Sequence, residues 1–346
     1  MKYHKIEIDE PFEFEAGGSI ARLELVYHTS DREYRPGEPV IWICHALTGN
    51  SNPEDWWPQT VGKGRLFDPD KYYIVCAGML CSPYGSSSPA SVNPATGRPY
   101  MMDFPKTTVR DVVRANILVR KHLGIEHIDL MIGPSIGGFQ ALEWVIMEPD
   151  MVSDAVFLAT STRVTPYMTA FNESQRMALE ADPEFMTAES LDSGKAGLAC
   201  ARSIALISYR TFEGYNRTQQ EPDKETLFAG RACSYQRYQG KKMVDRFDAY
   251  CYWYLTWMLD SQNVGRGRGG VEAALAQIKA DCLVVSIDSD VLFPPAHGKT
   301  TVAELRHARY AEISSAFGHD GFLIENDQLV GILQPLLDKL DKYDQI

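Results

Sequence analysis

The 346-residue sequence has no apolar run long enough to cross a bilayer, and its N-terminal segment lacks the apolar core of a secretory signal. We therefore expect no membrane association and a cytoplasmic location. Acidic residues outnumber basic ones, with 46 Asp and Glu against 34 Lys and Arg, so the formal net charge is −12. A nucleic-acid-binding surface needs clustered positive charge, so we expect no nucleic-acid partner.

The cysteines show neither a disulfide framework nor a metal-binding pattern. There are seven of them, an odd number, and no C-x-x-C pair occurs. Cys44, Cys76 and Cys282 lie inside apolar runs, where a thiol acts as a small buried hydrophobe. The pattern favours a reducing compartment with no structural disulfide and no metal site.

Short apolar segments predict an α/β protein. Two alternating segments, 6–8 and 20–27, are typical of antiparallel strands. Later apolar runs predict buried parallel strands, with amphipathic helices between several of them. Such alternation indicates a mostly parallel central sheet with helices on both faces. The predicted parallel strands are 40–44, 72–77, 128–132, 155–159, 283–287 and 310–313, and the predicted helices are 108–123, 139–147 and 329–340.

One long interval interrupts the alternation. Residues 166–279 contain helix-like segments such as 173–180 and 247–259 but no convincing strand. More than a hundred residues is far beyond an ordinary connection between strands. We expect a helical lid, 166–279, inserted into a core formed by 1–165 and 280–346.

The segment Gly133–Gly138 predicts a nucleophile. It reads Gly-Pro-Ser-Ile-Gly-Gly, directly after one predicted strand and before a predicted helix. A G-x-S-x-G pentad in that context turns the chain sharply and exposes the serine hydroxyl. Ser135 is therefore the candidate nucleophile.

A serine nucleophile needs a base and an acid that orients the base. Asp288 and Asp290 both follow the predicted strand 283–287, and either could supply the acid. His319 occupies a glycine-flanked turn behind the last predicted strand, which makes it the candidate base.

Backbone amides are the candidates for the oxyanion hole. One donor should be the N–H of Ile136, the residue after the nucleophile, and the other should be the N–H of Leu47 in the loop after the strand 40–44. His45, at the start of that loop, is interpreted as a packing histidine at the strand end rather than a catalytic residue.

Several longer segments carry a family resemblance, in one order from near residue 40 to near residue 326. They are HALTGNS from His45, YGSSSPASVNPATGRPY from Tyr84, DFPKTTVRD from Asp103, QALEW from Gln140, FNESQRMALEADPEF from Phe171, DRFDAYCYW from Asp245, VGRGRGG from Val264, DSDVLFPP from Asp288 and GHDGFLIE from Gly318. With these segments the chain resembles the homoserine O-acetyltransferases, enzymes of methionine biosynthesis with the α/β-hydrolase fold.

The resemblance implies roles for particular residues. The family's acid is the aspartate before x-L-F-P, which is Asp290 here. The segment 201–210 matches the pattern A-R-x-I-A-x-x-x-Y-R, and this match implies that Arg202 and Tyr209 bind the carboxylate of homoserine. Asp320, which follows His319, would then hold the α-ammonium group.

The resemblance also implies a reaction and a partner. An acetyl group would pass from acetyl-CoA, a co-substrate rather than a bound cofactor, to the hydroxyl of L-homoserine through an acyl-serine. A homodimer formed through the helical lid is expected.

Some alternatives stay open on the sequence. Pro134 and Ile136 depart from the family's usual G-G-S-M-G-G, so succinyl-CoA as donor and L-serine as acceptor are alternatives. A carboxylesterase or thioesterase that uses water would need the same triad. The residues that bind the phosphates of coenzyme A are undetermined, with Arg266 and Arg268 as candidates.

Overall fold

An eight-stranded sheet forms the centre of the molecule, and the computed structural model describes residues 1–343 of the chain. The order across the sheet is β1 (Lys2–Ile8), β4 (Leu23–Thr29), β6 (Tyr73–Ala77), β5 (Val40–Ile43), β9 (Ile128–Pro134), β10 (Val152–Leu158), β11 (Asp281–Ile287) and β12 (Ala308–Ile313). Strand β4 pairs antiparallel with both of its neighbours, β1 and β6, and all the other neighbouring strands of this sheet pair parallel.

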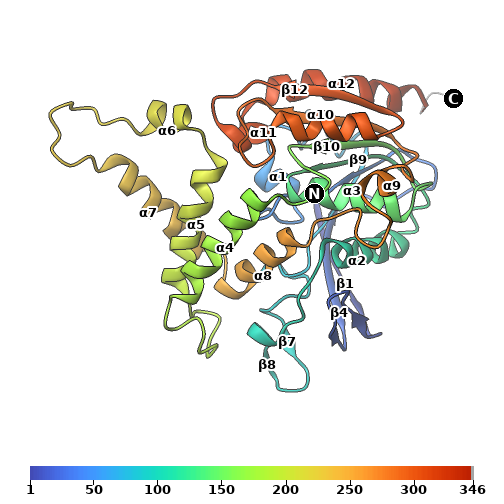
Figure 1. The fold of residues 1–346 in the computed structure, drawn as a ribbon. Helices are drawn as coiled ribbons and strands as arrows, with labels where there is room; N and C mark the ends of the chain where they lie inside the picture. Colours follow the sequence, from blue (N-terminus) through green and yellow to red (C-terminus); the bar gives the residue numbers. More distant parts are fainter. Residues whose placement is uncertain (344–346) are drawn as a thin grey trace.

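Helices cover both faces of this sheet (Figure 1). Trp42 and Ile41 are neighbours on β5 but belong to different hydrophobic clusters, because successive side chains of a strand point to opposite faces. One cluster packs against α2 (Val109–His122) and α3 (Ile136–Met147), and the other packs against α12 (Asn326–Tyr343). The predicted α/β fold with a mostly parallel, doubly covered sheet is confirmed.

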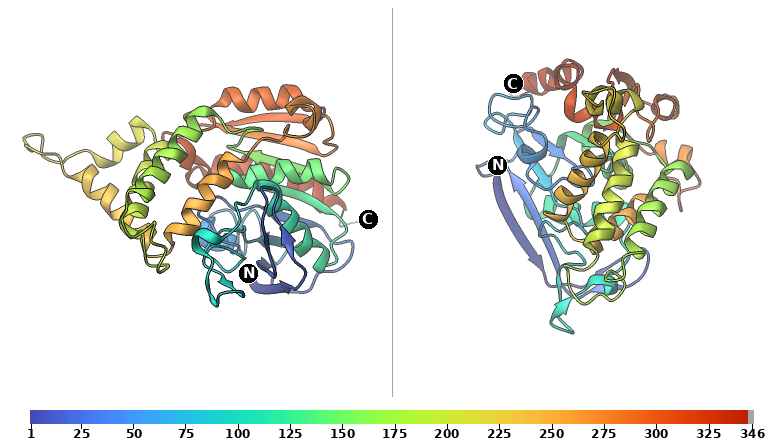
Figure 2. Two further views of the ribbon diagram at one scale, coloured as in Figure 1. Left: turned by 60° about the horizontal axis from the view of Figure 1, so that its bottom comes forward. Right: turned by 90° about the vertical axis from the view of Figure 1, so that its left-hand side faces the viewer.

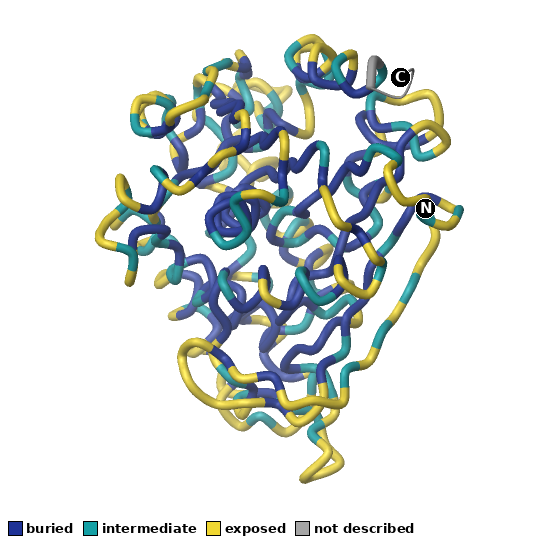
Figure 3. The backbone as a smooth tube through the Cα atoms, turned by 90° about the vertical axis from the view of Figure 1, so that its right-hand side faces the viewer, coloured by how far each residue is buried: buried dark blue, intermediate teal, exposed yellow. Residues whose placement is uncertain are grey.

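Burial follows this layering. The inner strands are buried along nearly their whole length, whereas the edge strand β1 is half-exposed (Figure 3). Among the described residues, no helix combines the length and the apolar composition that crossing a membrane requires.

The connection between β10 and β11 is helical. Its helices are α4 (Pro166–Glu180), α5 (Lys195–Tyr209), α6 (Phe212–Gln219), α7 (Arg231–Val244), α8 (Ala249–Asp260) and α9 (Val271–Leu275). Helices α5 to α7 extend away from the sheet in Figure 1 and in the left view of Figure 2. We refer to residues 166–279 as the insertion.

A buried arginine joins two helices of the insertion. Arg176 on α4 is 2% exposed, and its Nη2 donates to Asp260 Oδ2 at 2.7 Å at the end of α8. Its guanidinium also lies 4.1 Å from the ring centroid of Trp257. A buried cation is tolerated only when paired in this way, so the pair fixes α4 against α8.

The remaining elements are short and border the core. They are β2 (Phe12–Glu13), β3 (Ser19–Ile20), β7 (Val92–Asn93), β8 (Arg98–Pro99), α1 (Pro53–Trp56), α10 (Pro295–Glu304), α11 (Gly321–Ile324) and the 3-10 turns η1 (Met101–Asp103) and η2 (Gly318–Asp320). The sequence did not predict the hairpin β7–β8, because its two-residue strands are too short to show a pattern.

Candidate active site

Ser135 occupies the sharp turn between β9 and α3. Its φ and ψ are 58° and −123°, a conformation that residues with a Cβ rarely adopt. The turn is fixed on both sides, because the Ser135 N–H donates to the Leu158 carbonyl at 2.9 Å and the Ser135 carbonyl accepts from Thr160 Oγ1 at 2.9 Å. Strain held by its surroundings in this way is the signature of a nucleophile turn.

The glycines beside Ser135 allow backbones to touch. A Cβ on Gly133 would lie 2.1 Å from the Gly137 carbonyl carbon, and a Cβ on Gly137 would lie 2.1 Å from the Cys44 carbonyl oxygen. These contacts let α3 begin directly after Ser135, three residues before the predicted start at Phe139. Gly137 and Gly138, in the first turn of the helix, are poor helix formers, which is why the sequence placed the start too late.

Asp290 and His319 form a buried pair. Asp290 follows β11, and His319 lies in η2 after β12. His319 Nδ1 is 2.7 Å from Asp290 Oδ2, while Asp290 Oδ1 accepts the N–H groups of Leu292 at 2.8 Å and Phe293 at 3.0 Å. Both carboxylate oxygens are thus occupied, and one of them orients the imidazole.

The other candidate acid has a different environment. Asp288 Oδ2 accepts from Ser314 Oγ at 2.8 Å, and its Oδ1 accepts from the Ser315 N–H at 3.0 Å. These bonds tie the loop after β11 to the loop after β12. The structure brings Asp290, and not Asp288, to the histidine.

The surroundings of His319 act on its pKa in opposite directions. Burial lowers the pKa, but the charge and hydrogen bond of Asp290 and the charge of Asp320 raise it, with a net raised value. The rings of Phe293 and Phe322 lie 5.2 Å and 5.5 Å from the imidazole and hold its plane.

Ser135 and His319 are not yet hydrogen-bonded to each other. Within residues 1–343, no hydrogen bond joins the Ser135 hydroxyl to the imidazole. Catalytic bonds of this type often tighten only in the substrate complex. Ser135, Asp290 and His319 nevertheless follow the carboxyl ends of the parallel strands β9, β11 and β12, so they share one edge of the sheet.

The two candidate oxyanion donors are unpaired amides. In the described part of the chain, neither the Ile136 N–H nor the Leu47 N–H has a hydrogen-bond acceptor. Ile136 is the first residue of α3, where the N–H groups of a helix are free and its dipole favours negative charge.

The Leu47 amide belongs to a rigid turn. The Gly49 N–H and His45 Nδ1 both donate to the Ala46 carbonyl at 2.9 Å, and the Met79 N–H donates to His45 Nε2 at 3.0 Å. Burial lowers the pKa of His45 to about 4, so the ring stays neutral. Because the Ala46 carbonyl and the Leu47 N–H are parts of one planar peptide, fixing the oxygen also aims the N–H.

Residues of the insertion reach the same edge of the sheet. The guanidinium of Arg202 lies 5.5 Å from the ring centroid of Tyr209, and the Tyr209 ring lies 5.8 Å from the imidazole of His319. Asp320 Oδ2 accepts from Arg210 Nε at 2.6 Å. The structure therefore places Tyr209 beside His319 and Arg202 against Tyr209, with Asp320 next to His319 in the chain.

Comparisons with known proteins give the fold and the family of the chain. A family model described as the alpha/beta hydrolase fold matches residues 39–325. A homoserine O-acetyltransferase from Cyclobacterium marinum is 41% identical over 325 residues, which cover 94% of this chain and 92% of that protein. The chain belongs to the homoserine O-acetyltransferase family.

Solved structures show the same fold. The homoserine O-acetyltransferase from Bacillus anthracis aligns with a TM-score of 0.89 and 23% identity, and the alignment covers 97% of each chain. Esterase E22 aligns with a TM-score of 0.86 and 22% identity over 97% of this chain and 99% of that one. At these identities the two structures show the shared fold alone.

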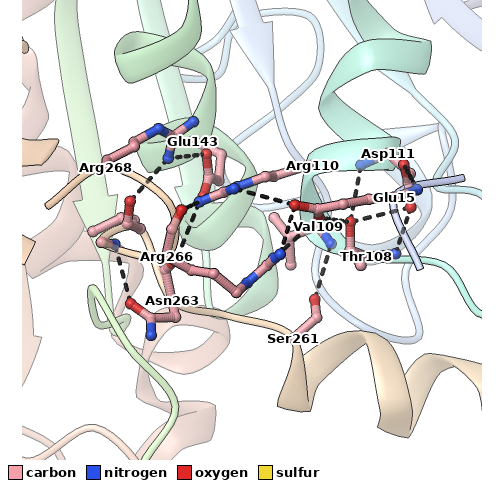
Figure 4. A network of polar contacts seen from close by, with 12 residues as sticks. Glu15, Thr108, Val109, Arg110, Asp111, Glu143, Ser261, Asn263, Arg266 and Arg268 are labelled. Atoms are coloured by element: carbon pink, nitrogen blue, oxygen red, sulfur yellow. Dashed lines mark hydrogen bonds and ion pairs between the residues drawn. The ribbon is translucent and has the colours of Figure 1, made fainter. Parts of the chain in front are cut away.

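Two arginines that the sequence left as candidates for coenzyme A phosphates are already paired (Figure 4). Arg266 donates to both carboxylate oxygens of Glu15, at 2.5 and 3.0 Å. Arg268 donates to Glu143 Oε2 at 2.7 Å, and Arg110 donates to the other oxygen of this buried carboxylate at 3.1 Å. The network anchors the glycine-rich loop to α2 and α3, which disfavours phosphate binding by these groups.

Sequence reasoning missed Arg210, the partner of Asp320. Its signal was present, since Arg210 is the last residue of the matched segment 201–210 and directly follows Tyr209. Only the fold shows that the end of α5 meets η2 and pairs the two charges. Among the described residues, no group of three or more His, Cys, Asp or Glu side chains could hold a metal ion.

The glycine contacts predict a stability difference. Gly137→Ala would place a Cβ 2.1 Å from a backbone oxygen that cannot move aside, so we expect the free energy of unfolding to fall by at least about 2 kcal/mol. Gly331→Ala on α12, with nothing within 4 Å, is the control and should gain about 0.5–1 kcal/mol. Urea unfolding of both variants measures this, and equal stabilities would contradict the packing argument.

The His319–Asp290 pair predicts a pH dependence. Acylation by p-nitrophenyl acetate needs neutral His319, so its acidic limb should have a midpoint above the ordinary value of 6.5, because the pKa is raised. Asp290→Asn should move that midpoint down and slow acylation by about 10³–10⁴-fold. An unchanged midpoint in Asp290→Asn would refute the pairing.

The same pKa shift affects stability. Because the folded chain binds this proton more tightly than the unfolded chain, the stabilisation is complete below pH 6.5 and is lost as pH rises through the folded pKa.

Proposed function

We propose that this chain transfers an acetyl group from acetyl-CoA to the hydroxyl of L-homoserine, in the pathway to methionine. The observation that carries the proposal is the series of contacts from Arg202 to Tyr209 and from Tyr209 to His319, with Asp320 directly after His319, in a member of the homoserine O-acetyltransferase family. A guanidinium suits a carboxylate and an aspartate suits an ammonium, so this arrangement fits an α-amino acid as acceptor.

In the first half-reaction, Ser135 is acetylated. His319 Nε2 takes the Ser135 proton as the serine oxygen attacks the thioester carbonyl, and the oxyanion accepts hydrogen bonds from the Leu47 and Ile136 amides. The carbon–sulfur bond then breaks, and the departing thiolate takes the proton from His319. Coenzyme A leaves and acetyl-Ser135 remains.

In the second half-reaction, homoserine replaces the thiol. Arg202 and Tyr209 bind its carboxylate, and Asp320 Oδ1 is available for its ammonium because Oδ2 is held by Arg210. His319 takes the hydroxyl proton as the homoserine oxygen attacks the acetyl carbon. The ester bond to Ser135 breaks, and the serine oxygen regains the proton from His319.

The insertion has a separate task in this proposal. We divide the chain into a core, 1–165 and 280–346, which supplies the triad, and a lid, 166–279, which supplies Arg202 and Tyr209. Water is a competing acceptor, so transfer requires that homoserine be held in attacking geometry while water is restricted. A lid that carries the acceptor site does both.

A homodimer through the lid is also proposed. Three side chains on or beside its outer helices are almost fully exposed: Phe212 at 88%, Leu227 at 84% and Phe228 at 85%. Large apolar side chains this exposed would be buried by contact with a second chain, which supports the proposal. A cytoplasmic location is proposed as well, because seven free thiols suit a reducing compartment.

The reaction is tested with a panel of donors and acceptors. Acetyl-CoA and succinyl-CoA are each combined with homoserine and L-serine, with coenzyme A release as the readout. We expect the acetyl-CoA and homoserine pair to be fastest, with ping-pong kinetics and an acetyl group on Ser135 in mass spectra. Ser135→Ala should abolish both the release of coenzyme A and the acetyl group seen in mass spectra.

Other results of the panel would select other functions. Coenzyme A release or p-nitrophenyl acetate turnover that is indifferent to homoserine would identify a thioesterase or carboxylesterase. Preference for succinyl-CoA or L-serine would identify a related transferase.

The dimer is tested by light scattering of the purified chain. We expect the mass of two chains, and Phe228→Asp should give single chains because a charge would be buried at the contact. The control variant Arg306→Gln changes a solvent-exposed residue outside the lid and should leave the mass unchanged. A wild-type chain that stays monomeric at micromolar concentration would reject the dimer.

A further inference from the structure

One arginine of the insertion contacts the turn that carries Leu47. Arg246 lies between α7 and α8, and its Nη1 donates to the Thr48 carbonyl at 2.8 Å and to the Tyr84 hydroxyl at 2.5 Å. Thr48 directly follows Leu47, although Arg246 is 198 positions away along the chain. The contact is therefore made between the insertion and the core.

The neighbours of Arg246 hold it in this position. Phe247 is 5% exposed, and its ring packs edge-on against Tyr84 at 5.7 Å and against Tyr252 at 6.0 Å. Asp248 caps the start of α8 by accepting the Cys251 N–H at 2.8 Å. The guanidinium thus extends from an anchored turn, even though its own side chain is exposed to solvent.

The turn transmits this contact to the Leu47 amide. The Thr48 carbonyl, which accepts from Arg246, belongs to the same peptide group as the Gly49 N–H. That N–H donates at 2.9 Å to the Ala46 carbonyl, which belongs to the same peptide group as the Leu47 N–H. A cation, two linked peptide groups and a free N–H therefore form one hydrogen-bonded series.

Each member of such a series strengthens the next. A peptide whose oxygen accepts a hydrogen bond becomes a better donor at its nitrogen, and a charged donor at the head of the series has the largest effect. The planarity of the two peptides also fixes direction, because each oxygen and the hydrogen opposite it move together. His45 Nδ1 supports the same Ala46 oxygen from the core side.

We propose that Arg246 is a positioning residue for the oxyanion hole, which aims and polarises the Leu47 N–H through the Thr48–Gly49 and Ala46–Leu47 peptides. The docked position of the insertion and the strength of the oxyanion donor are then coupled. The inference rests on the proposed function in one respect, namely that Leu47 is an oxyanion donor.

An exposed guanidinium near the site has one competing role, direct contact with a substrate anion. The two roles differ in what they change. A weaker oxyanion donor slows both half-reactions and leaves substrate affinity alone, whereas the loss of a substrate contact raises KM for that substrate.

The experiment compares variants of the full chain in two assays. The first assay is the burst of p-nitrophenol when p-nitrophenyl acetate acylates Ser135, which needs neither homoserine nor coenzyme A. The second gives kcat and KM for acetyl-CoA and homoserine. The variants are Arg246→Gln, Arg246→Lys and Tyr84→Phe, with Arg306→Gln as the matched control and Arg202→Gln as the comparator for substrate binding.

We expect Arg246→Gln to slow the burst and lower kcat by about 10-fold or more, with KM for both substrates within about twofold of wild type. Arg246→Lys should recover part of the rate, since an ammonium can donate to the Thr48 carbonyl. Tyr84→Phe should stay near wild type, because the Thr48 contact survives. Arg202→Gln should instead raise KM for homoserine.

Two outcomes would overturn the inference. One is an unchanged burst in Arg246→Gln with a raised KM for either substrate, which assigns Arg246 to substrate binding. The other is an equal loss in Arg306→Gln, which means that the effect is not specific. A wild-type chain that shows the burst but ignores homoserine would reject the proposed acceptor, and the burst would still decide the role of Arg246.

Discussion

Helix α3 starts one residue after Ser135 and passes so close to the end of β5 that only a glycine fits at position 137. This backbone approach places the start of α3, with its free N–H groups, next to the loop after β5 that carries Leu47. It also requires the positive φ of Ser135, which the Leu158 carbonyl and Thr160 hydroxyl hold in place. The rest of the site is arranged around that turn.

Buried polar groups at the site are paired almost throughout, and the pairing determines their chemistry. Asp290 has both oxygens occupied and keeps His319 in one orientation. His45 is fixed in one tautomer because its Nε2 accepts from an amide and its Nδ1 donates to a carbonyl. Within residues 1–343 the Leu47 and Ile136 amides, by contrast, have no hydrogen-bond acceptor, and negative charge would develop beside them in the proposed acyl transfer.

The core and the insertion contribute different things to the candidate site. The core holds the candidate nucleophile, acid, base and amides on loops that follow parallel strands, where rigid scaffolds commonly place chemistry. From the insertion, Tyr209, Arg210 and Arg246 contact loops of the core, and Arg202 lies against the Tyr209 ring. In the proposed reaction, the insertion thus binds the acceptor while the triad belongs to the core.

Local patterns were enough to predict the sheet, the covering helices and the candidates Ser135 and His319, whereas the choice of Asp290 over Asp288 came from the family resemblance. An apolar run indicates a buried segment, and a G-x-S-x-G sequence indicates the conformation of its own backbone. Neither inference needs knowledge of residues far away in the chain. The exact start of α3 was missed because helix propensity disfavours Gly137 and Gly138, whereas packing against Cys44 and Thr160 requires small residues there. The hairpin β7–β8 was missed because its strands are too short to show a period.

By itself, the sequence determined the fold class, the candidate nucleophile and the family resemblance, since these depend on residues near one another in the chain. Tertiary structure alone decided which charges meet. It placed Arg210 on Asp320, Arg266 on Glu15 and Arg246 on the Thr48 carbonyl, across separations of 110, 251 and 198 residues. Such pairs leave no local pattern, because an arginine in a helix or loop has the same sequence neighbours whether it faces solvent, a carboxylate or a substrate.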